Sequence, residues 1–217
     1  MIRDYIKKFK RKKFYHDIIE SLIRALEAKD IYTKGHSDRV AKMAEDMCKE
    51  LGIRGRTKET IHIAAHLHDI GKIGVPDEIL NKPGKLTDNE WEKIKLHPTI
   101  GHDILGNSKE LKQISKIVLH HHERWDGGGY PMGIKEKEIP VGSRIIAICD
   151  SIDAITSKRS YKNAMSWECC RTEIEKNLSI MFDPTFGKAA LKLIPTWSQE
   201  LKYPKNQCEY KYEIIKN

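Results

Sequence analysis

Apolar residues recur along this chain at intervals of three or four, the spacing that places side chains on one face of an α-helix. Three early stripes of this kind cover residues 14–26, 40–51 and about 57–71. In the first stripe, the residues expected on the buried face are Phe14, Ile18, Leu22 and Leu26, flanked by Ile19 and Ile23. Runs of β-branched residues bounded by turn residues, which are typical of strands, are few. The pattern therefore predicts an all-α fold.

Boundary signals predict further helices along the rest of the chain. Thr87 and Glu90 have the spacing of a capping box, in which two side chains bond backbone N–H groups at a helix start. Apolar residues at 111–118 predict a helix that leads into a run of histidines. Residues 139–156 predict another helix, and Asp183 followed by a proline is typical of a helix start.

The length of 217 residues suits one domain with short appendages. We expect a basic N-terminal helix over residues 1–29, which is a candidate linker remnant, then a main domain over 30–195 and a C-terminal extension over 196–217. The net charge is +8, but the first thirteen residues alone hold seven Lys or Arg against one Asp. The main domain is therefore nearly neutral, and we expect no nucleic-acid binding.

Targeting and membrane signals are missing from the pattern. No apolar run approaches the roughly eighteen residues that a membrane span needs, and the charged start is not followed by an unbroken apolar segment. The chain is therefore expected to be cytoplasmic. Five cysteines without a CxxC pair do not indicate a zinc ribbon.

Histidine and carboxylate side chains accumulate at the expected helix ends. A single histidine on a helix is more often a packing residue than a ligand, so the argument depends on their number. Five imidazoles and two carboxylates offer nitrogen and oxygen donors that suit Fe, Mn, Zn, Co or Ni. The sequence therefore predicts a metal site. Its candidate ligands are His36, His68, Asp69, His97, His121, His122 and Asp150.

A lysine follows the central acid of this set. Asp69 can bridge two ions, and Lys72, about one turn further along, can offer a cation to an anionic ligand of the metals. The alternative for Lys72 is an ordinary cation at a helix end that satisfies backbone carbonyls.

Five motifs occur in a fixed order: HSDRV at 36–40, HDIGKIG at 68–74, HPTIG at 97–101, HHERWDGGGYP at 121–131 and CDSIDAITSKRSYK at 149–162. Together they resemble the HD-GYP family, a branch of the HD phosphohydrolases. Many phosphohydrolases share the HD doublet, whereas HHExxDGxGYP is specific to this branch. The resemblance covers most of the chain and implies that the main domain is a catalytic HD-type helical bundle with its metal site at several helix ends.

The resemblance also implies roles for the candidate ligands. One metal would be held by His36, His68, Asp69 and Asp150, and the second by His97, His121, His122 and the bridging Asp69. Some family members resemble three-metal sites and carry a glutamate four residues before the first histidine. Tyr32 stands at that position here, and a phenol is a poor ligand at neutral pH. Two tightly held ions are therefore expected.

The implied reaction is phosphodiester hydrolysis. The resemblance points to cyclic di-GMP, opened to linear pGpG, with a second cut to GMP left open. Two divalent ions, with Fe or Mn favoured over Zn, Co and Ni, would lower the pKa of a bridging water so that hydroxide attacks phosphorus in line. Another cyclic dinucleotide such as cyclic GMP-AMP is one alternative. A module that senses a nucleotide or docks a protein without turnover is another.

The family motifs imply further contacts beyond the metals. Asp69 and Lys72 would act in catalysis, and Lys72, Arg159 and Lys162 would contact a substrate phosphate. The basic pair could equally be a solvated helix end. The loop with Gly129, Tyr130 and Pro131 would dock a signalling protein, and its glycines would permit positive φ angles or close backbone approach.

Overall fold

The computed structural model describes residues 17–30, 35–157 and 164–201. These residues contain helices and no β-strand, apart from an isolated bridge between Leu178 and Phe182. The all-α prediction is confirmed. After an unlabelled helix at 17–29 come α2 (His36–Glu50), α3 (Gly55–Leu67), the 3-10 helix η1 (Ile70–Gly74), α4 (Asp77–Leu80), α5 (Asp88–Ile94), α6 (His97–Gly106), α7 (Lys112–Leu119), the 3-10 helix η2 (Glu136–Glu138), α8 (Val141–Thr156), α9 (Trp167–Lys176) and α10 (Pro184–Glu200).

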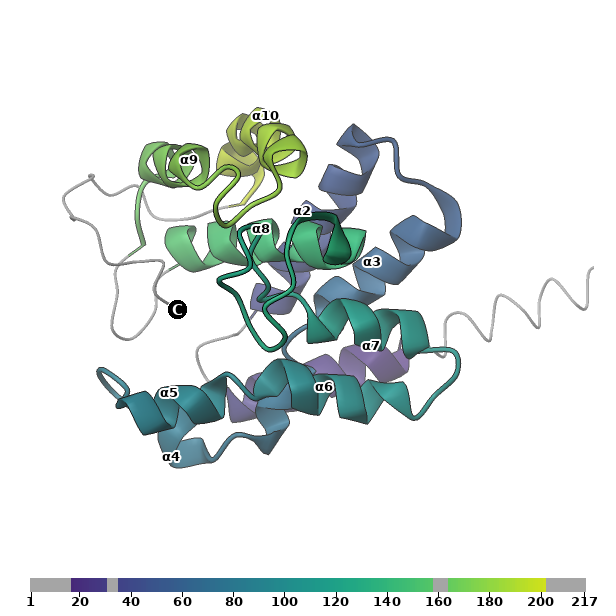
Figure 1. Cartoon of the computed structure of the whole chain (residues 1–217), viewed down its shortest axis with the longest axis vertical. Helices are drawn as coiled ribbons and strands as arrows, with labels where there is room; N and C mark the ends of the chain where they lie inside the picture. The colour runs from purple at the N-terminus through teal and green to yellow at the C-terminus, as the bar shows by residue number, and fades with distance from the viewer. Residues whose placement is uncertain (1–16, 31–34, 158–163, 202–217) are drawn as a thin grey trace, which may run out of the picture.

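Helix α8 runs through the centre of the bundle. It contacts α2, α3, α7, α9 and α10, and Figure 1 shows it surrounded by them. Its apolar residues lie on more than one face, so it is buried on several sides. Ile145, Ile146, Ile148 and Ile152 are fully buried in the resulting core. Because α8 is held on all these sides, side chains that it projects toward α2 and α3 have fixed positions.

Helices α6 and α7 lie side by side below α8 in the view of Figure 1, where α7 contacts both α3 and α8 and η1 packs against α6. The contact between η1 and α6 is made by backbone. A Cβ atom on Gly71 would lie 1.9 Å from the His97 carbonyl oxygen and 2.5 Å from the Gly101 nitrogen. Only glycine therefore fits at Gly71, and this contact fixes the first turn of α6 beside the chain that follows α3.

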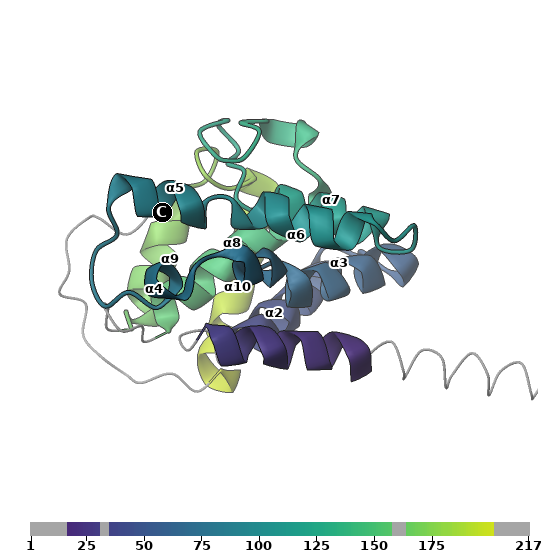
Figure 2. The same cartoon turned by 90° about the horizontal axis from the view of Figure 1, so that it is seen from below.

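Helix 17–29 lies along the edge of the bundle beside α2 and α3, as Figure 2 shows. The buried face predicted for it is confirmed at Leu26 but wrong at Ile18 and Leu22. Ile18 and Leu22 are 41% and 43% exposed, whereas Ile23 and Leu26 are buried. Two apolar stripes run next to each other along this helix, and the one that meets the domain starts one residue later. Residues 1–16 and 202–217, which carry the basic segment and most of the predicted extension, lie outside the described residues.

Most predicted helix boundaries are confirmed. The capping box of Thr87 and Glu90 is present, and the Asp183 carboxylate accepts hydrogen bonds from the first backbone N–H groups of α10. The third helix, however, ends at Leu67 and not at Gly71. The tighter η1 replaces its last turn because Gly71 must pack on the α6 backbone. No helix in the described part of the chain is long and apolar enough to span a membrane.

Candidate metal centre

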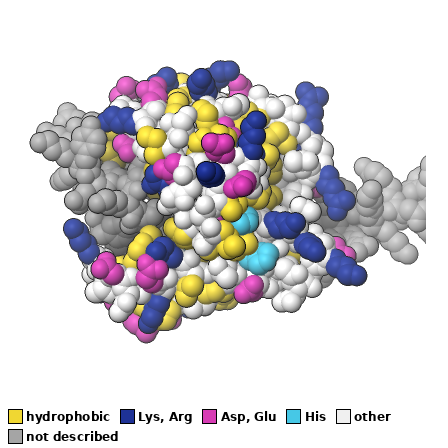
Figure 3. Space-filling view, viewed as in Figure 1, with side chains coloured by type: hydrophobic (Ala, Val, Ile, Leu, Met, Phe, Trp, Pro, Cys, Tyr) yellow, Lys and Arg dark blue, Asp and Glu magenta, His cyan; other side chains and the backbone are white. Residues whose placement is uncertain are grey.

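The ends of four helices and the middle of a fifth converge on one point inside the bundle. His36 opens α2, His68 and Asp69 lie between α3 and η1, His97 opens α6, and Asp150 lies within α8. The paired histidines His121 and His122 follow α7. Histidine side chains reach the surface near the middle of the face shown in Figure 3. The structure thus brings together all the candidate ligands predicted from the sequence.

The carboxylate of Asp69 lies at the centre of this group and is buried. Its Oδ1 is 3.3 Å from His97 Nε2, while its Oδ2 is 3.5 Å from His68 Nε2 and 3.7 Å from His36 Nε2. The two oxygens therefore face different sets of histidines. Asp69 has φ −94° and ψ 3°, a sparsely populated backbone region in which active-site residues are often found.

The donor atoms form two clusters that share Asp69. His36 and His68 complete one cluster, and His97, His121 and His122 complete the other; within each, the ligand atoms lie within 4.8 Å of one another. Asp150 adds to the first cluster, because its Oδ1 is 3.3 Å from His36 Nε2. Such a set of nitrogen and oxygen atoms fits two transition-metal ions.

The hydrogen bonds of the rings give independent support for metal binding. His97 Nδ1 lies 2.8 Å from the Ile94 carbonyl, and His121 Nδ1 lies 2.6 Å from the Val118 carbonyl. A carbonyl oxygen only accepts, so each Nδ1 carries the proton and each neutral ring presents a lone pair at Nε2. These two Nε2 atoms are 3.2 Å apart. Two facing lone pairs repel each other unless a cation lies against both.

The electrostatics of the site keep these ligands in the metal-binding form. Burial lowers the pKa of His97 to about 4, although the Asp69 charge opposes this. Burial, followed by the neighbouring histidines, holds the pKa values of His121 and His122 well below the usual range. Burial alone would raise the pKa of Asp69, but Lys72 and the surrounding histidines hold it well below its usual range. The Asp69 carboxylate is thus ionised, and the imidazoles of His97, His121 and His122 are neutral at pH 7.

Comparison with known proteins gives the family. A family model described as "HD domain" matches residues 20–186. The chain belongs to the HD domain family. The match includes every candidate ligand and begins inside helix 17–29, and the resemblance expected from the motifs is confirmed.

Two curated relatives illustrate the similarity of this HD domain to proteins of stated activity. A cyclic di-GMP phosphodiesterase of Thermotoga maritima is 44% identical over 182 residues, which is 83% of this chain and 50% of the relative. The 3'3'-cGAMP-specific phosphodiesterase 2 of Vibrio cholerae is 38% identical over 178 residues, or 81% of this chain and 34% of the relative. The chain thus spans only about a third to a half of these relatives.

Solved structures confirm the fold of the HD domain. A cyclic GMP-AMP specific phosphodiesterase of V. cholerae superposes with a TM-score of 0.62 at 18% identity, over 82% of this chain and 48% of that one. The HD domain of an L. monocytogenes phosphodiesterase, in complex with cyclic-di-AMP, gives 0.61 at 17% identity, over 87% of this chain and all of the other.

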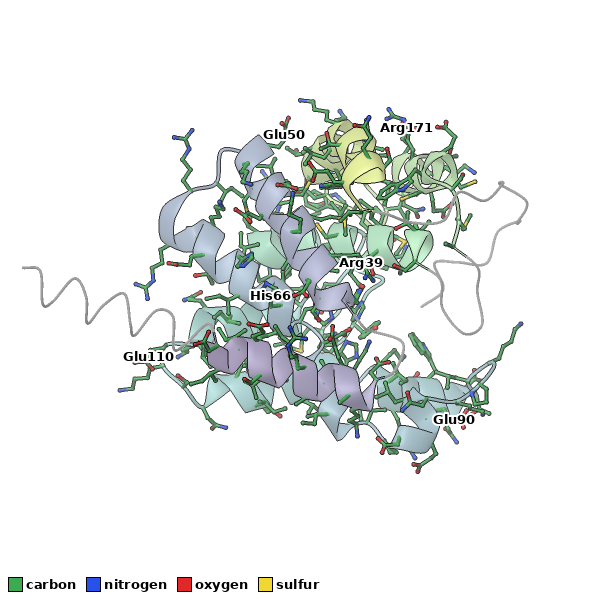
Figure 4. All side chains as sticks on the ribbon, turned by 180° about the vertical axis from the view of Figure 1, so that it is seen from behind. Arg39, Glu50, His66, Glu90, Glu110 and Arg171 are labelled. Carbon is green, nitrogen blue, oxygen red and sulfur yellow. The ribbon has the colours of Figure 1, made fainter. Side chains whose placement is uncertain are left out.

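Two residues that sequence reasoning missed hold the HD domain's first histidine. Asp153 is buried and its Oδ2 accepts from His36 Nδ1 at 2.7 Å, while Arg39 Nε donates to its Oδ1 at 2.6 Å. Figure 4 labels Arg39 in the first turn of α2, where it faces α8. Burial would raise the pKa of Asp153, but His36 and Arg39 lower it below its usual range. The position of Asp153 one turn after Asp150 was the available signal.

Lys72 lies where the sequence predicted, but with a partner that was not predicted. Its Nζ donates to Asp69 Oδ2 at 2.7 Å and lies 3.4 Å from Asp30 Oδ2. Asp30 follows helix 17–29 and is buried. Lys72 therefore contacts two buried carboxylates, which supports a role beyond that of an ordinary cation at a helix end.

The loop with the GYP motif packs against the turn after α7 that carries His122. The Tyr130 ring stacks on His122 at 4.9 Å between centroids, and the Tyr130 N–H donates to the His122 carbonyl. A Cβ atom on Gly129 would lie 2.4 Å from the Arg124 nitrogen, so this glycine allows close approach within the chain. Gly127 has a positive φ of 84°. Pro131 follows in a cis peptide bond, and the next residue, Met132, is 65% exposed.

Some of the residues considered in the sequence analysis lie outside the described part of the chain. Arg159, Lys162 and Tyr32 lie outside the described residues. The other described histidines, His62, His66, His102 and His120, belong to neither ligand cluster. Of these, His102 Nδ1 lies 3.2 Å from the Ser115 carbonyl between α6 and α7, which suits a packing role.

Proposed function

We propose that this HD domain is a metal-dependent phosphodiesterase that hydrolyses a cyclic dinucleotide, with cyclic di-GMP as the first candidate. One observation carries the proposal: the two oxygens of the buried Asp69 carboxylate face two separate histidine clusters. A carboxylate in this position can be shared by two ions. The similarity to a cyclic di-GMP phosphodiesterase at 44% identity supports the choice of substrate.

Each residue has a role that its position supports. His36, His68 and Asp150 would hold one ion, while the second would be held by the other three histidines, with Asp69 shared. Two divalent ions at this site supply acidified water and offset the charge on phosphoryl oxygens. Lys72 lies at the edge of the site, where its ammonium can donate to a phosphoryl oxygen while it contacts Asp69. Arg159 and Lys162 stay predictions as phosphate contacts.

Metal identity and number belong to the proposal as well. The donor set favours no single ion among Fe, Mn, Zn, Co and Ni, since availability in the cell also decides which one binds. We propose two tightly held ions, with Fe and Mn as the first candidates to test. Anomalous scattering at several metal edges from crystals grown with metal would test this. A fully occupied third ion bound by protein ligands would contradict the two-ion proposal.

The decisive experiment is anaerobic purification and metal analysis, followed by a hydrolysis assay on the same sample. We expect about two ions per chain and conversion of cyclic di-GMP to pGpG, with GMP as a possible later product. A protein loaded with metal that binds the dinucleotide without cleaving it would support the sensing alternative and overturn the proposed reaction.

Cyclic GMP-AMP is the second candidate substrate, because several relatives carry that specificity in their names, at 38% and 37% identity. Side-by-side turnover of the two cyclic dinucleotides by one preparation would decide between them. A kcat/KM for cyclic GMP-AMP well above that for cyclic di-GMP would replace the first candidate.

A signalling protein that docks at the GYP loop also stays a proposal. Tyr130 is largely covered by His122 and by Trp91, whose ring meets it edge to face. A partner would therefore contact exposed neighbours such as Met132 more readily than the tyrosine itself. A partner that binds equally well to Met132→Glu would argue against this surface.

A further inference from the structure

The five candidate histidine ligands are not all held in the same way. Four of them form a hydrogen bond at Nδ1, which fixes the ring and directs Nε2 toward the site. These pairs are His36 with Asp153, His68 with the Ala65 carbonyl, His97 with the Ile94 carbonyl and His121 with the Val118 carbonyl. Within the described part of the chain, no residue forms a hydrogen bond with a ring nitrogen of His122. The orientation of this ring therefore has another source.

A neighbouring aromatic ring supplies that source. The Tyr130 ring lies nearly parallel to the His122 ring, with 24° between the planes and 4.9 Å between the centroids. This separation is in the range in which offset-stacked aromatic rings attract each other. His97 and His121 also contact His122, at 5.0 and 4.1 Å between centroids, but they belong to the same ligand cluster. Tyr130 is thus the support that comes from outside the cluster.

Two backbone hydrogen bonds attach Tyr130 to the turn that carries His122. The Tyr130 N–H donates to the His122 carbonyl at 3.2 Å, and the Met132 N–H donates to Glu123 Oε1 at 2.7 Å. The Met132 side chain is exposed, so the second attachment depends on its backbone alone. Because the bonds lie before and after Pro131, they fix the loop on both sides of that residue.

Glu123 is buried without the partners that a buried acid normally has. Its side chain is 0% exposed, and its Oε2 is buried with no hydrogen-bond partner among the described residues. His120 Nδ1 lies 3.7 Å from Oε1, which is too long for a hydrogen bond. Burial of a carboxyl group with one hydrogen bond, to Met132, costs more free energy than that bond returns. Such a cost is typical of a residue that serves a functional site.

We propose that Tyr130 is a positioning residue for His122, and that Glu123 holds Tyr130 in place through the Met132 N–H. The inference rests on the proposed function in taking His122 as a metal ligand. The stacked ring opposes rotation of the imidazole and keeps a ring nitrogen directed into the cluster with His97. Without the stack, His122 rotates more freely, and the ion at this cluster loses a ligand for part of the time.

The test uses pairs of variants in the full chain. Tyr130→Ala removes the ring and Tyr130→Phe keeps it, while Glu123→Leu removes the acceptor and Glu123→Gln keeps one. Phe186→Ala is the matched control, because it removes a ring that packs 5.0 Å from the Arg144 guanidinium carbon and not on a candidate ligand. Competition with a chelator measures the affinity for each of two cobalt(II) ions, and the cobalt absorption spectrum reports the ligand environment. Urea unfolding of the metal-free protein measures stability. His121→Ala identifies the binding step that belongs to the second cluster.

We expect Tyr130→Ala to weaken this step about three- to tenfold, as for the loss of one aromatic pair, and to leave the other step unchanged. Tyr130→Phe should bind both ions like the parent. Glu123→Leu should weaken the same step at least about twofold, as for the loss of one neutral hydrogen bond, and Glu123→Gln should lie closer to the parent. Tyr130→Ala combined with Glu123→Leu should match Tyr130→Ala alone, because the effect of Glu123 passes through Tyr130. Phe186→Ala should lose stability but not cobalt affinity.

An affinity for cobalt like that of the parent in Tyr130→Ala would overturn the inference. An equal loss in Tyr130→Phe would also overturn it, because the hydroxyl and not the stacked ring would then be responsible. Equal weakening of both steps, or the same loss in Phe186→Ala, would show general destabilisation in its place. If Tyr130→Ala does not fold, Tyr130→Leu replaces it with the same expectations. Failure of the proposed function is seen separately, as a parent protein that binds two ions tightly but cleaves no cyclic dinucleotide.

Discussion

Asp153 holds the imidazole of His36 from the side opposite the metal site. The ring nitrogen Nδ1 donates to Asp153 at 2.7 Å, and Nε2 is thereby directed toward Asp69 and Asp150. A carboxylate behind a histidine fixes both the tautomer and the direction of the ligand nitrogen. The pair shows that the geometry of this site depends on residues that never touch an ion.

Removing this support should weaken metal binding without removing a ligand. We expect Asp153→Asn to lower metal affinity about 10- to 100-fold, as is typical of such outer partners. Competition with a chelator of known affinity measures the change. The control is Asp183→Asn, which breaks a buried ion pair with Arg144 away from the site. Equal metal loss in both variants would show that general destabilisation, and not the His36 contact, is responsible.

Asp69→Ala should remove most of the bound metal and all turnover while the fold survives. The substitution deletes the carboxylate that faces both clusters, but the surrounding helices keep their apolar contacts. Metal analysis measures the bound metal, far-UV circular dichroism measures the helical fold, and the hydrolysis assay measures turnover. The exposed Asp103 on α6 provides the control, since Asp103→Ala should change none of them. Full metal content in Asp69→Ala would refute the assignment of Asp69 as a shared metal ligand.

Gly71→Ala should destabilise the domain by more than the roughly 1 to 3 kcal/mol of ordinary overpacking. The new Cβ would meet backbone atoms of His97 and Gly101, which cannot rotate away as a side chain can. Urea unfolding measures the loss. The control is Gly106→Ala at the end of α6, where the nearest atom to a new Cβ is 3.9 Å away. That variant should be neutral or slightly more stable. Similar midpoints for the two variants would contradict the close contact.

Metal-free protein should lose stability as the pH falls from about 6.5 to about 4. His97 has a pKa of about 4 in the fold and an ordinary value near 6.5 when unfolded. Between these values the unfolded chain binds more protons, so the free energy of unfolding rises with pH and falls on acidification. For His97 alone the loss is at most about 3 kcal/mol. Urea titrations at several pH values measure the slope, which should be shallower in His97→Gln.

The candidate ligands could be predicted because each is a histidine or acid within a motif, and all but Asp150 lie at helix ends. Asp153 lies in the same motif one turn later, but the sequence does not show which nitrogen of His36 faces inward. The position of Asp30 depends on how helix 17–29 docks. The docking face of that helix could not be predicted either. Ile18 and Ile19 begin adjacent stripes of similar hydrophobicity, and only the shape of the domain selects between them.

The backbone contact between Gly71 and α6 limits how this protein can diverge. A larger residue at one of the two positions cannot be accommodated by a smaller one at the other, because Gly71 and Gly101 already lack side chains. The two positions differ in what else could make room: a Cβ on Gly101 would first meet the Val118 side chain at 2.9 Å, which a smaller residue could replace, whereas a Cβ on Gly71 meets backbone. In a mutational library selected for metal binding, Gly71 should therefore be as intolerant as the candidate ligands, although it offers no atom to an ion.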